Sequence, residues 1–167
     1  ETEKVYHGIK VQVQKLEAAG HRVEAMDFPY LDALVPIYYI LTTAEASSNL
    51  ARYDGVHVGH RSENASDLES LYKKSRSEGF GEEVQRRILL GTFVLSAGYF
   101  DAFYGKAQKA RRVVRDATLE ALQQVDALIG PTTPHTAFPL GQEYTAPTVL
   151  YLEDIFHNKV NIFLFKI

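Results

Sequence analysis

Two adjacent serines, Ser47 and Ser48, stand in the stretch TAEASSNLARYDG, so a serine nucleophile is the first chemistry to consider. An activated serine needs a nearby base and a tight turn whose N–H groups stabilise an oxyanion, and such turns are usually rich in glycine. Here the neighbours Ala46 and Asn49 continue a helical pattern instead. The sequence therefore predicts that the serines are small polar packing residues between helices and not the nucleophile.

The second candidate is the arginine pair Arg86–Arg87. On an α-helix, Arg87 projects on the same side as Gly91 and Gly98, whereas Arg86 projects elsewhere. A glycine-lined face indicates that another backbone or a ligand approaches it. An arginine on that face can bind a carboxylate through two parallel hydrogen bonds. From the residues alone, a structural salt bridge and carboxylate binding both remain open for Arg87, and the salt bridge is the more common case.

The remaining charged candidates have ordinary interpretations. Asp154 lies among bulky apolar residues, where a carboxylate usually caps a helix or pairs with a cation and less often holds a ligand ammonium. His57 and His60 lie in a polar loop without a third ligand at matching spacing, so no metal site is predicted. A basic stretch is usually a solvated helix face, with contact to RNA phosphates as the alternative; it comprises Lys106, Lys109, Arg111, Arg112 and Arg115.

Helices that alternate with short strands are predicted to position these residues. Apolar residues at helical spacing predict a first helix that ends at Gly20, and residues 22–26 are predicted to form a strand. Pro36 is predicted to open the helix that carries the serines, because its missing N–H costs least there. Ser66 and Glu69 have the spacing of a capping box before a short helix.

Two further helices and a last strand are predicted downstream. Glu82 and Glu83 place negative charge at a helix start, which the helix dipole favours. Another helix is predicted over residues 99–124, and a short strand over residues 127–129. Helices that alternate with strands are typical of an α/β layer protein. No repeat or linker divides the sequence, so one piece is predicted.

The composition limits the classes of function. A chain of 167 residues with 46% hydrophobic residues favours one globular domain. The absence of cysteine excludes disulfides, thiolate metal sites and a cysteine nucleophile. A net charge of −3 argues against a dominant nucleic-acid surface. No long apolar run and no signal peptide occurs, so no membrane contact is predicted and the cytoplasm is the expected location.

Three stretches of the chain carry recognisable motifs: YYILTTAEASSNLARYDGVHVGHRS, SRSEGFGEEVQRRILLGTFVLSAGYFDAFYGKAQKARR and DALIGPTTPHTAFPLG. Together they resemble consecutive blocks of the A subunits of glutamyl-tRNA(Gln) amidotransferases, which are amidase-signature enzymes. The resemblance implies an α/β class protein with a partial amidase-signature fold, in which helices pack on part of a mixed β-sheet. It also implies that residues 1–167 are a single partial domain, the second half of such a domain.

The resemblance implies a ligase function that uses glutamine as the amido donor. A subunits of this family hydrolyse glutamine and send ammonia through a tunnel to a partner B subunit. The B subunit uses ATP and Mg to activate Glu-tRNA(Gln) for conversion to Gln-tRNA(Gln), and a small C subunit braces the pair. No cofactor is expected in this chain. The family's catalytic lysine and two serines, with their glycine- and serine-rich loop, have no counterpart in the sequence, so the chain alone is expected to be inactive.

By the same resemblance, the family's glutamine-pocket residues fall on Tyr38, Arg87 and Asp154. Arg87 would grip the α-carboxylate, Asp154 the α-ammonium, and Tyr38 would close the pocket; Tyr39 and Arg86 are the neighbours to consider if the alignment shifts. The chain departs from the family pattern after Asp154, where it reads IFHNKVNIFLFKI. Two alternatives remain, another amidase-signature hydrolase of small amides and a non-catalytic module that assembles the B and C subunits.

Overall fold

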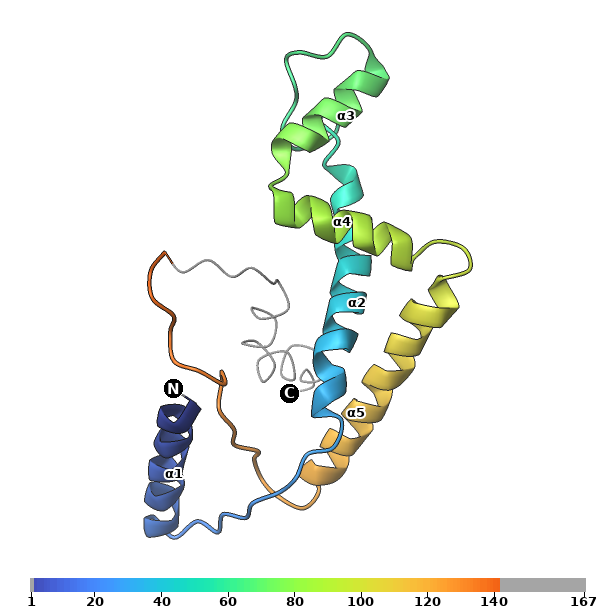
Figure 1. Cartoon of the computed structure of the whole chain (residues 1–167). Coiled ribbons are helices and arrows are strands. Elements are labelled where there is room, and N and C mark those ends of the chain that lie inside the picture. The colour runs from blue at the N-terminus through green and yellow to red at the C-terminus, as the bar shows by residue number, and fades with distance from the viewer. Residues whose placement is uncertain (1, 142–167) are drawn as a thin grey trace. The chain divides into compact units, whose positions relative to one another are not determined.

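The computed structural model describes residues 2–141, which form helices joined by loops (Figure 1). The described residues belong to two compact units, one formed by residues 2–38 and 110–141 and the other by Tyr39–Lys109. None of the helices in this part of the chain is long and apolar enough to cross a membrane. The elements in chain order are α1 (Thr2–Ala18), α2 (Leu31–Asn49), the 3-10 helix η1 (Leu50–Arg52), α3 (Leu68–Gly79), α4 (Glu82–Val94), the π-helix η2 (Phe100–Gly105) and α5 (Lys106–Leu122).

The predicted helices are observed, but the predicted strands are not. Residues 22–26 and 127–129 are irregular. A strand exists only where its N–H and C=O groups bond to a neighbouring strand, and residues 2–141 contain no strand that could pair with either segment. The mixed sheet of the α/β prediction is therefore not confirmed in this part of the chain.

Helix α2 starts at Leu31, so the prediction that Pro36 opens it is wrong. Pro36 lies inside the helix and lacks the N–H that would bond to the carbonyl of Asp32. The helix continues through this gap because its apolar residues recur at helical spacing and are buried, including Leu34 at 0% and Ile37 at 3% exposure. Burial of such a face stabilises a helix more than residue propensity does.

Helix α3 begins with a capping box shifted by one residue from the prediction. Asp67 is the N-cap: its Oδ1 accepts from the Ser70 N–H at 2.8 Å, and the Ser70 hydroxyl oxygen accepts from the Asp67 N–H at 3.0 Å. The bond from the Ser70 N–H is the main cause that lowers the pKa of Asp67. A negatively charged side chain at a helix N-terminus is favoured by the helix dipole, which favours Asp67 over Ser66 in this position.

A loop in the second unit, residues 54–64, is fastened to α3 by polar contacts. The Ser62 N–H donates to the Ser75 hydroxyl at 3.0 Å, and both residues are buried. The Ser62 hydroxyl donates to Glu78 Oε1 at 2.9 Å. The other oxygen of Glu78 lies 2.8 Å from His60 Nε2. Glu78 thus ties two points of the loop to the last turn of α3.

Because Glu78 is ionisable, the attachment of this loop to α3 is expected to depend on pH. The bonds from His60 and then Ser62 lower the pKa of Glu78 below its ordinary value of 4.5. Since the folded pKa is the lower one, the stabilisation is present above about pH 4.5 and is lost as the pH falls through the folded pKa. We expect the Ser62 amide to lose hydrogen-exchange protection in that acidic range, after correction for intrinsic rates. Glu78→Gln should remove the pH dependence, and an equal fall in that variant would contradict the assignment.

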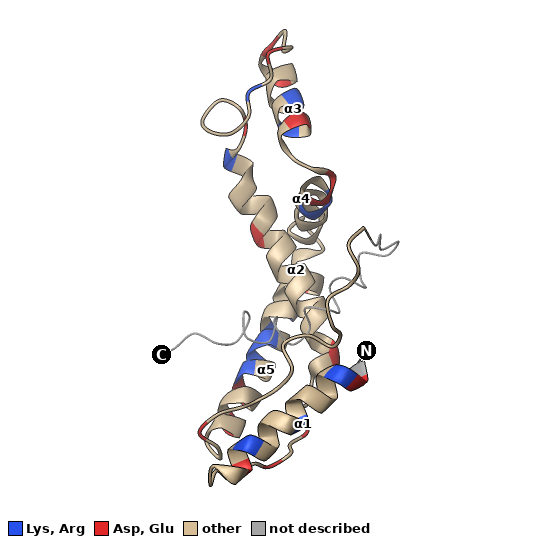
Figure 2. Ribbon diagram, turned by 90° about the vertical axis from the view of Figure 1, so that its left-hand side faces the viewer, with Lys and Arg blue, Asp and Glu red and all other residues tan. Residues whose placement is uncertain are grey.

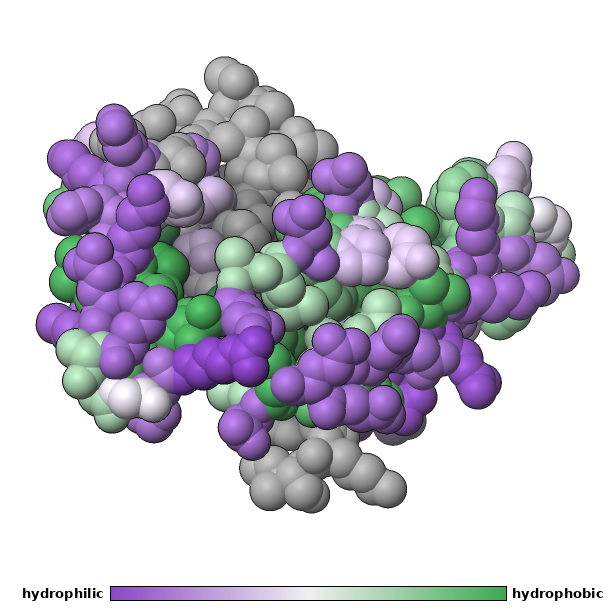
Figure 3. Space-filling view, turned by 90° about the horizontal axis from the view of Figure 1, so that it is seen from below, coloured by the Kyte–Doolittle hydropathy of each residue, from purple (hydrophilic) through white to green (hydrophobic). Residues whose placement is uncertain are grey.

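Large hydrophobic side chains reach the surface of the described part, and Figure 3 shows hydrophobic residues (green) between hydrophilic ones on one face. In the second unit, Leu89 of α4 is 72% exposed and Phe93 is 43% exposed. The Phe93 ring packs at a tilt against Tyr99 and Phe103 beyond the helix, with ring centroids 4.3 and 5.9 Å away. These ring contacts connect α4 to η2. One side of α4 therefore faces outward, and its opposite side is buried.

Candidate functional site

The buried side of α4 lies directly against α2, and Figure 1 shows the two helices crossing. A Cβ atom on Gly91 would lie 1.9 Å from the Thr43 carbonyl oxygen and 2.7 Å from the Ser47 Cβ. The hydroxyls of Ser47 and Thr92 share a hydrogen bond of 2.9 Å across the crossing. Ser47 is thus a small packing residue between helices, as predicted, while Ser48 is exposed.

The prediction of a glycine-lined face on α4 is correct for Gly91 and wrong for Gly98. Gly91 shares a face with Arg87, one turn before it, and the backbone of α2 approaches there. Gly98 lies beyond the end of α4 at Val94, in a turn with φ of +90° that suits glycine. The sequence pattern continued the helix one turn too far, because it contains no breaker between Gly91 and Gly98.

Arg86 and Arg87 both pair with glutamates in the first turn of α4, where Figure 2 shows acidic and basic residues together. Glu83 contacts both arginines: Oε1 lies 3.0 Å from Arg87 Nε, and Oε2 lies 2.7 Å from Arg86 Nη1. Arg86 also reaches Glu82 at 3.1 Å. The spacing of three and four residues could have revealed these pairs from the sequence. The structural salt bridge that we considered for Arg87 is therefore present.

The two arginines differ in exposure, and this difference bears on their chemistry. The Arg87 side chain is 26% exposed, against 45% for Arg86. Coulomb attraction and hydrogen bonds are stronger where water is partly excluded. A guanidinium has several N–H donors in one plane, so it can serve Glu83 and a second carboxylate together. Arg87 is therefore the better placed of the two for binding an anionic ligand group.

Of the other residues assigned to the glutamine pocket or considered as its neighbours, Tyr38 and Tyr39 lie within the described residues. Tyr38 is half-buried on α2 and belongs to the first unit, whereas Arg87 belongs to the second unit. Tyr39 is half-buried and begins the second unit, and its carbonyl accepts a 2.6 Å bond from the Thr43 hydroxyl. Asp154 lies outside the described residues.

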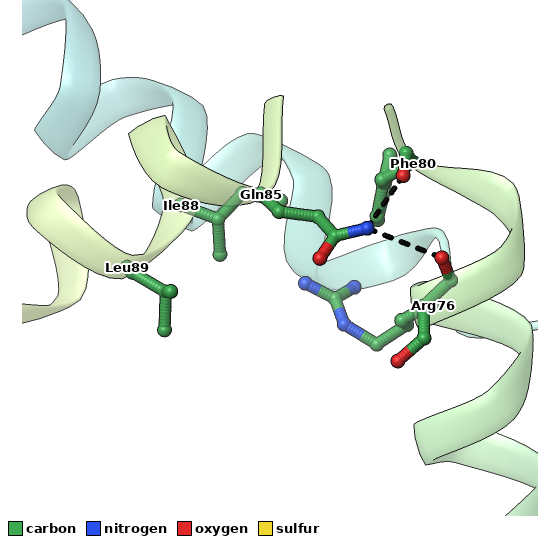
Figure 4. Close-up of a pocket in the computed structure, with 6 residues that line it drawn as sticks. Arg76, Phe80, Gln85, Ile88 and Leu89 are labelled. Atoms are coloured by element: carbon green, nitrogen blue, oxygen red, sulfur yellow. Dashed lines mark hydrogen bonds between the residues drawn. The ribbon is translucent and has the colours of Figure 1, made fainter. Parts of the chain in front are cut away.

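The joint between α3 and α4 fixes the start of the helix that carries Arg87. The Gln85 side-chain amide donates to the carbonyls of Ser77 at 3.1 Å and Phe80 at 2.7 Å, across the break between the helices (Figure 4). The Arg76 guanidinium donates to the Leu50 carbonyl at 2.8 Å and lies over the Phe80 ring. The sequence did not single out Gln85 or Arg76, because side-chain bonds to backbone carbonyls leave no spacing signal.

A small open cavity of about 150 Å³ lies at this joint. Ile88 and Leu89 form its apolar side (Figure 4), and Arg76 and Gln85 supply polar groups. Both of these polar side chains bond to backbone carbonyls, so their contacts hold the helices together. The cavity is therefore part of the packing between α3 and α4, and no substrate is assigned to it.

The two loop histidines pair with different carboxylates. His57 Nδ1 lies 2.7 Å from Asp54 Oδ2, and this hydrogen bond is the main cause that lowers the pKa of Asp54. His60 pairs with Glu78. Within residues 2–141, no group of three or more His, Asp or Glu side chains could hold a metal ion. The histidines therefore stabilise the loop through hydrogen bonds to these carboxylates.

Comparison with known proteins assigns the family. Residues 2–165 match the Amidase family. The chain is 52% identical over 154 residues to the A subunit of the glutamyl-tRNA(Gln) amidotransferase of Halorhodospira halophila, covering 92% of this chain and 32% of that relative. It is 51% identical over 148 residues to the protein of the same name from Chlorobaculum tepidum, covering 89% and 31%.

A solved structure agrees with these relatives. The crystal structure of the glutamyl-tRNA(Gln) amidotransferase A subunit from Thermotoga maritima matches with a TM-score of 0.64 and 38% identity, covering 96% of this chain and 30% of that chain. This structural match supports the prediction of a partial amidase-signature fold. This chain spans about a third of the length of the relatives that it matches. The match over residues 2–165 shows that the chain belongs to the amidase family.

Proposed function

We propose that this chain is part of the A subunit of a glutamyl-tRNA(Gln) amidotransferase and supplies the substrate-recognition side of its glutaminase site. Relatives with about 50% identity carry that subunit's name. In the proposed reaction, the A subunit hydrolyses glutamine, and the ammonia converts Glu-tRNA(Gln) to Gln-tRNA(Gln) in the complex. The partners are the B and C subunits, with ATP and Mg used by B, and the location is the cytoplasm.

Arg87 is the residue whose geometry supports this proposal best. It is 26% exposed, its Nε is held by Glu83, and it shares a face of α4 with the crossing at Gly91. Glutamine differs from a simple amide by its α-carboxylate and α-ammonium, so a pocket selective for it needs fixed charges of opposite sign. In our proposal, Arg87 binds the carboxylate, Asp154 binds the ammonium and Tyr38 closes the pocket.

Catalytic residues are not assigned to this chain. The family's lysine and serine pair have no counterpart in the sequence; of the two serines of TAEASSNLARYDG, Ser47 packs at the crossing of α2 and α4 and Ser48 is exposed. That the 167-residue chain alone lacks glutaminase activity remains a prediction. The assignment of residues 1–167 to a single partial domain also remains a prediction.

Nitrogen-donor specificity tests the proposal. A complete A subunit that carries this sequence should hydrolyse glutamine and, with B, C, ATP and Glu-tRNA(Gln), form Gln-tRNA(Gln). The measurements are ammonia release and the amount of amidated tRNA. Hydrolysis of aryl or alkyl amides with refusal of glutamine would instead indicate another amidase-signature hydrolase. Binding to B and C without hydrolysis of any amide would indicate an assembly module.

A further inference from the structure

Glu83 is the common partner of the two adjacent arginines on α4. Its Oε1 lies 3.0 Å from Arg87 Nε, and its Oε2 lies 2.7 Å from Arg86 Nη1. The Glu83 side chain is 45% exposed, half as much as that of Glu82 at 90%. One carboxylate thus restrains two long side chains at once, on the first turns of a helix whose dipole favours a negative charge there.

The contact at Nε restricts the orientation of the Arg87 guanidinium. An arginine side chain has many rotamers, and fixing it on ligand binding costs about 0.5–1.5 kcal/mol in lost freedom. A hydrogen bond at Nε holds the guanidinium plane before any ligand arrives. Two parallel hydrogen bonds to a carboxylate require that plane to be correctly oriented. Preorganisation of Arg87 would therefore improve ligand binding without any direct contact between Glu83 and the ligand.

We propose that Glu83 is a positioning residue that presets Arg87 for the α-carboxylate of the amide donor. This proposal rests on the proposed function, because it assumes that Arg87 binds glutamine. The arrangement also assigns Arg86 a supporting role, since it holds Oε2 of the same carboxylate and so fixes the Glu83 rotamer. Glu82 contacts Arg86 at 3.1 Å and is nearly fully exposed, which makes it the matched control.

The test compares three variants in the complete amidotransferase: Glu83→Ala, Glu83→Gln and Glu82→Ala. Loss of a charge-assisted hydrogen bond is expected to raise the KM for glutamine about tenfold in Glu83→Ala. The kcat at saturating glutamine should stay within about twofold, because the reacting atoms are elsewhere. Glu83→Gln should restore most of the affinity, since its amide oxygen still accepts from Nε. Glu82→Ala should leave the KM unchanged.

The reaction with free ammonia separates positioning from a general structural role. It bypasses the glutamine pocket, so Glu83→Ala should leave it intact. Equal loss of the glutamine and ammonia reactions, or an unchanged KM for glutamine in Glu83→Ala, would overturn the positioning role. If the unmodified enzyme uses glutamine normally in the same assay, that failure concerns Glu83 alone. If the unmodified enzyme does not use glutamine, the proposed function itself has failed.

Discussion

Replacement of Arg87 by lysine is expected to disable the use of glutamine while leaving the use of free ammonia intact. Arginine offers a planar pair of donors to a carboxylate, and lysine cannot reproduce that geometry. Loss of such a partly desolvated charge pair costs on the order of 2–5 kcal/mol. This corresponds to a roughly 30- to several-thousand-fold loss of kcat/KM for glutamine. The measurement is amidated tRNA formed by the complete amidotransferase with each nitrogen donor.

Arg86→Lys is the matched control, because Arg86 lies next to Arg87 on the same helix but is more exposed, at 45% against 26%. Lysine at position 86 keeps a positive charge beside Glu82 and Glu83, so the support that Arg86 gives to the Glu83 carboxylate is largely retained. We therefore expect a mild effect on either donor. If both variants use glutamine normally, or if Arg87→Lys loses both reactions equally, Arg87 acts only in its ion pair with Glu83.

Replacement of Gly91 by alanine is expected to cause a large loss of stability by forcing α2 and α4 apart. The new Cβ would lie 1.9 Å from the Thr43 carbonyl oxygen, a backbone atom that cannot move without shifting α2. Overpacking of a well-packed contact typically costs about 1–3 kcal/mol and occasionally more. We expect a value near the upper limit, about 3 kcal/mol, and, because the complete subunit is about three times as long as this chain, a fall in Tm of roughly 3 °C. Thermal unfolding of the complete A subunit measures it.

Gly8→Ala is the control for this change. Gly8 lies inside α1, and a Cβ there would meet no atom within 4 Å. Alanine is favoured over glycine in a helix by about 1 kcal/mol, so Gly8→Ala should not lower the Tm. A Tm for Gly91→Ala equal to that of the unmodified protein would show that the two helices can separate freely. In that case, the close contact between α2 and α4 would not determine the position of Arg87.

The sequence predicted the helices better than the strands. The helix that starts at Glu82 was placed correctly, because its acidic first turn and apolar spacing are local signals. The predicted strands at residues 22–26 and 127–129 were not confirmed, since a strand depends on a partner elsewhere in the chain. Pro36 was misplaced because buried apolar residues outweighed the one hydrogen bond that it removes.

The candidate site was predictable only in part. The face shared by Arg87 and Gly91 followed from helix geometry, and the structure places the α2 backbone against it. The double contact of Glu83 depends on side-chain rotamers, so spacing alone could suggest the pairs but not which carboxylate oxygen serves which arginine. The roles of Tyr38 and Asp154 come from the family resemblance and remain proposals.

The most direct test of the central claim compares glutamine with its α-carboxamide analogue, which lacks the α-carboxylate. Hydrolysis of both compounds is measured in the complete A subunit and in its Arg87→Lys variant. If Arg87 binds the carboxylate, the unmodified enzyme should prefer glutamine by about two orders of magnitude, and the variant should lose most of that preference. An undiminished preference in the variant would contradict the assignment of Arg87 and, with it, our account of the site.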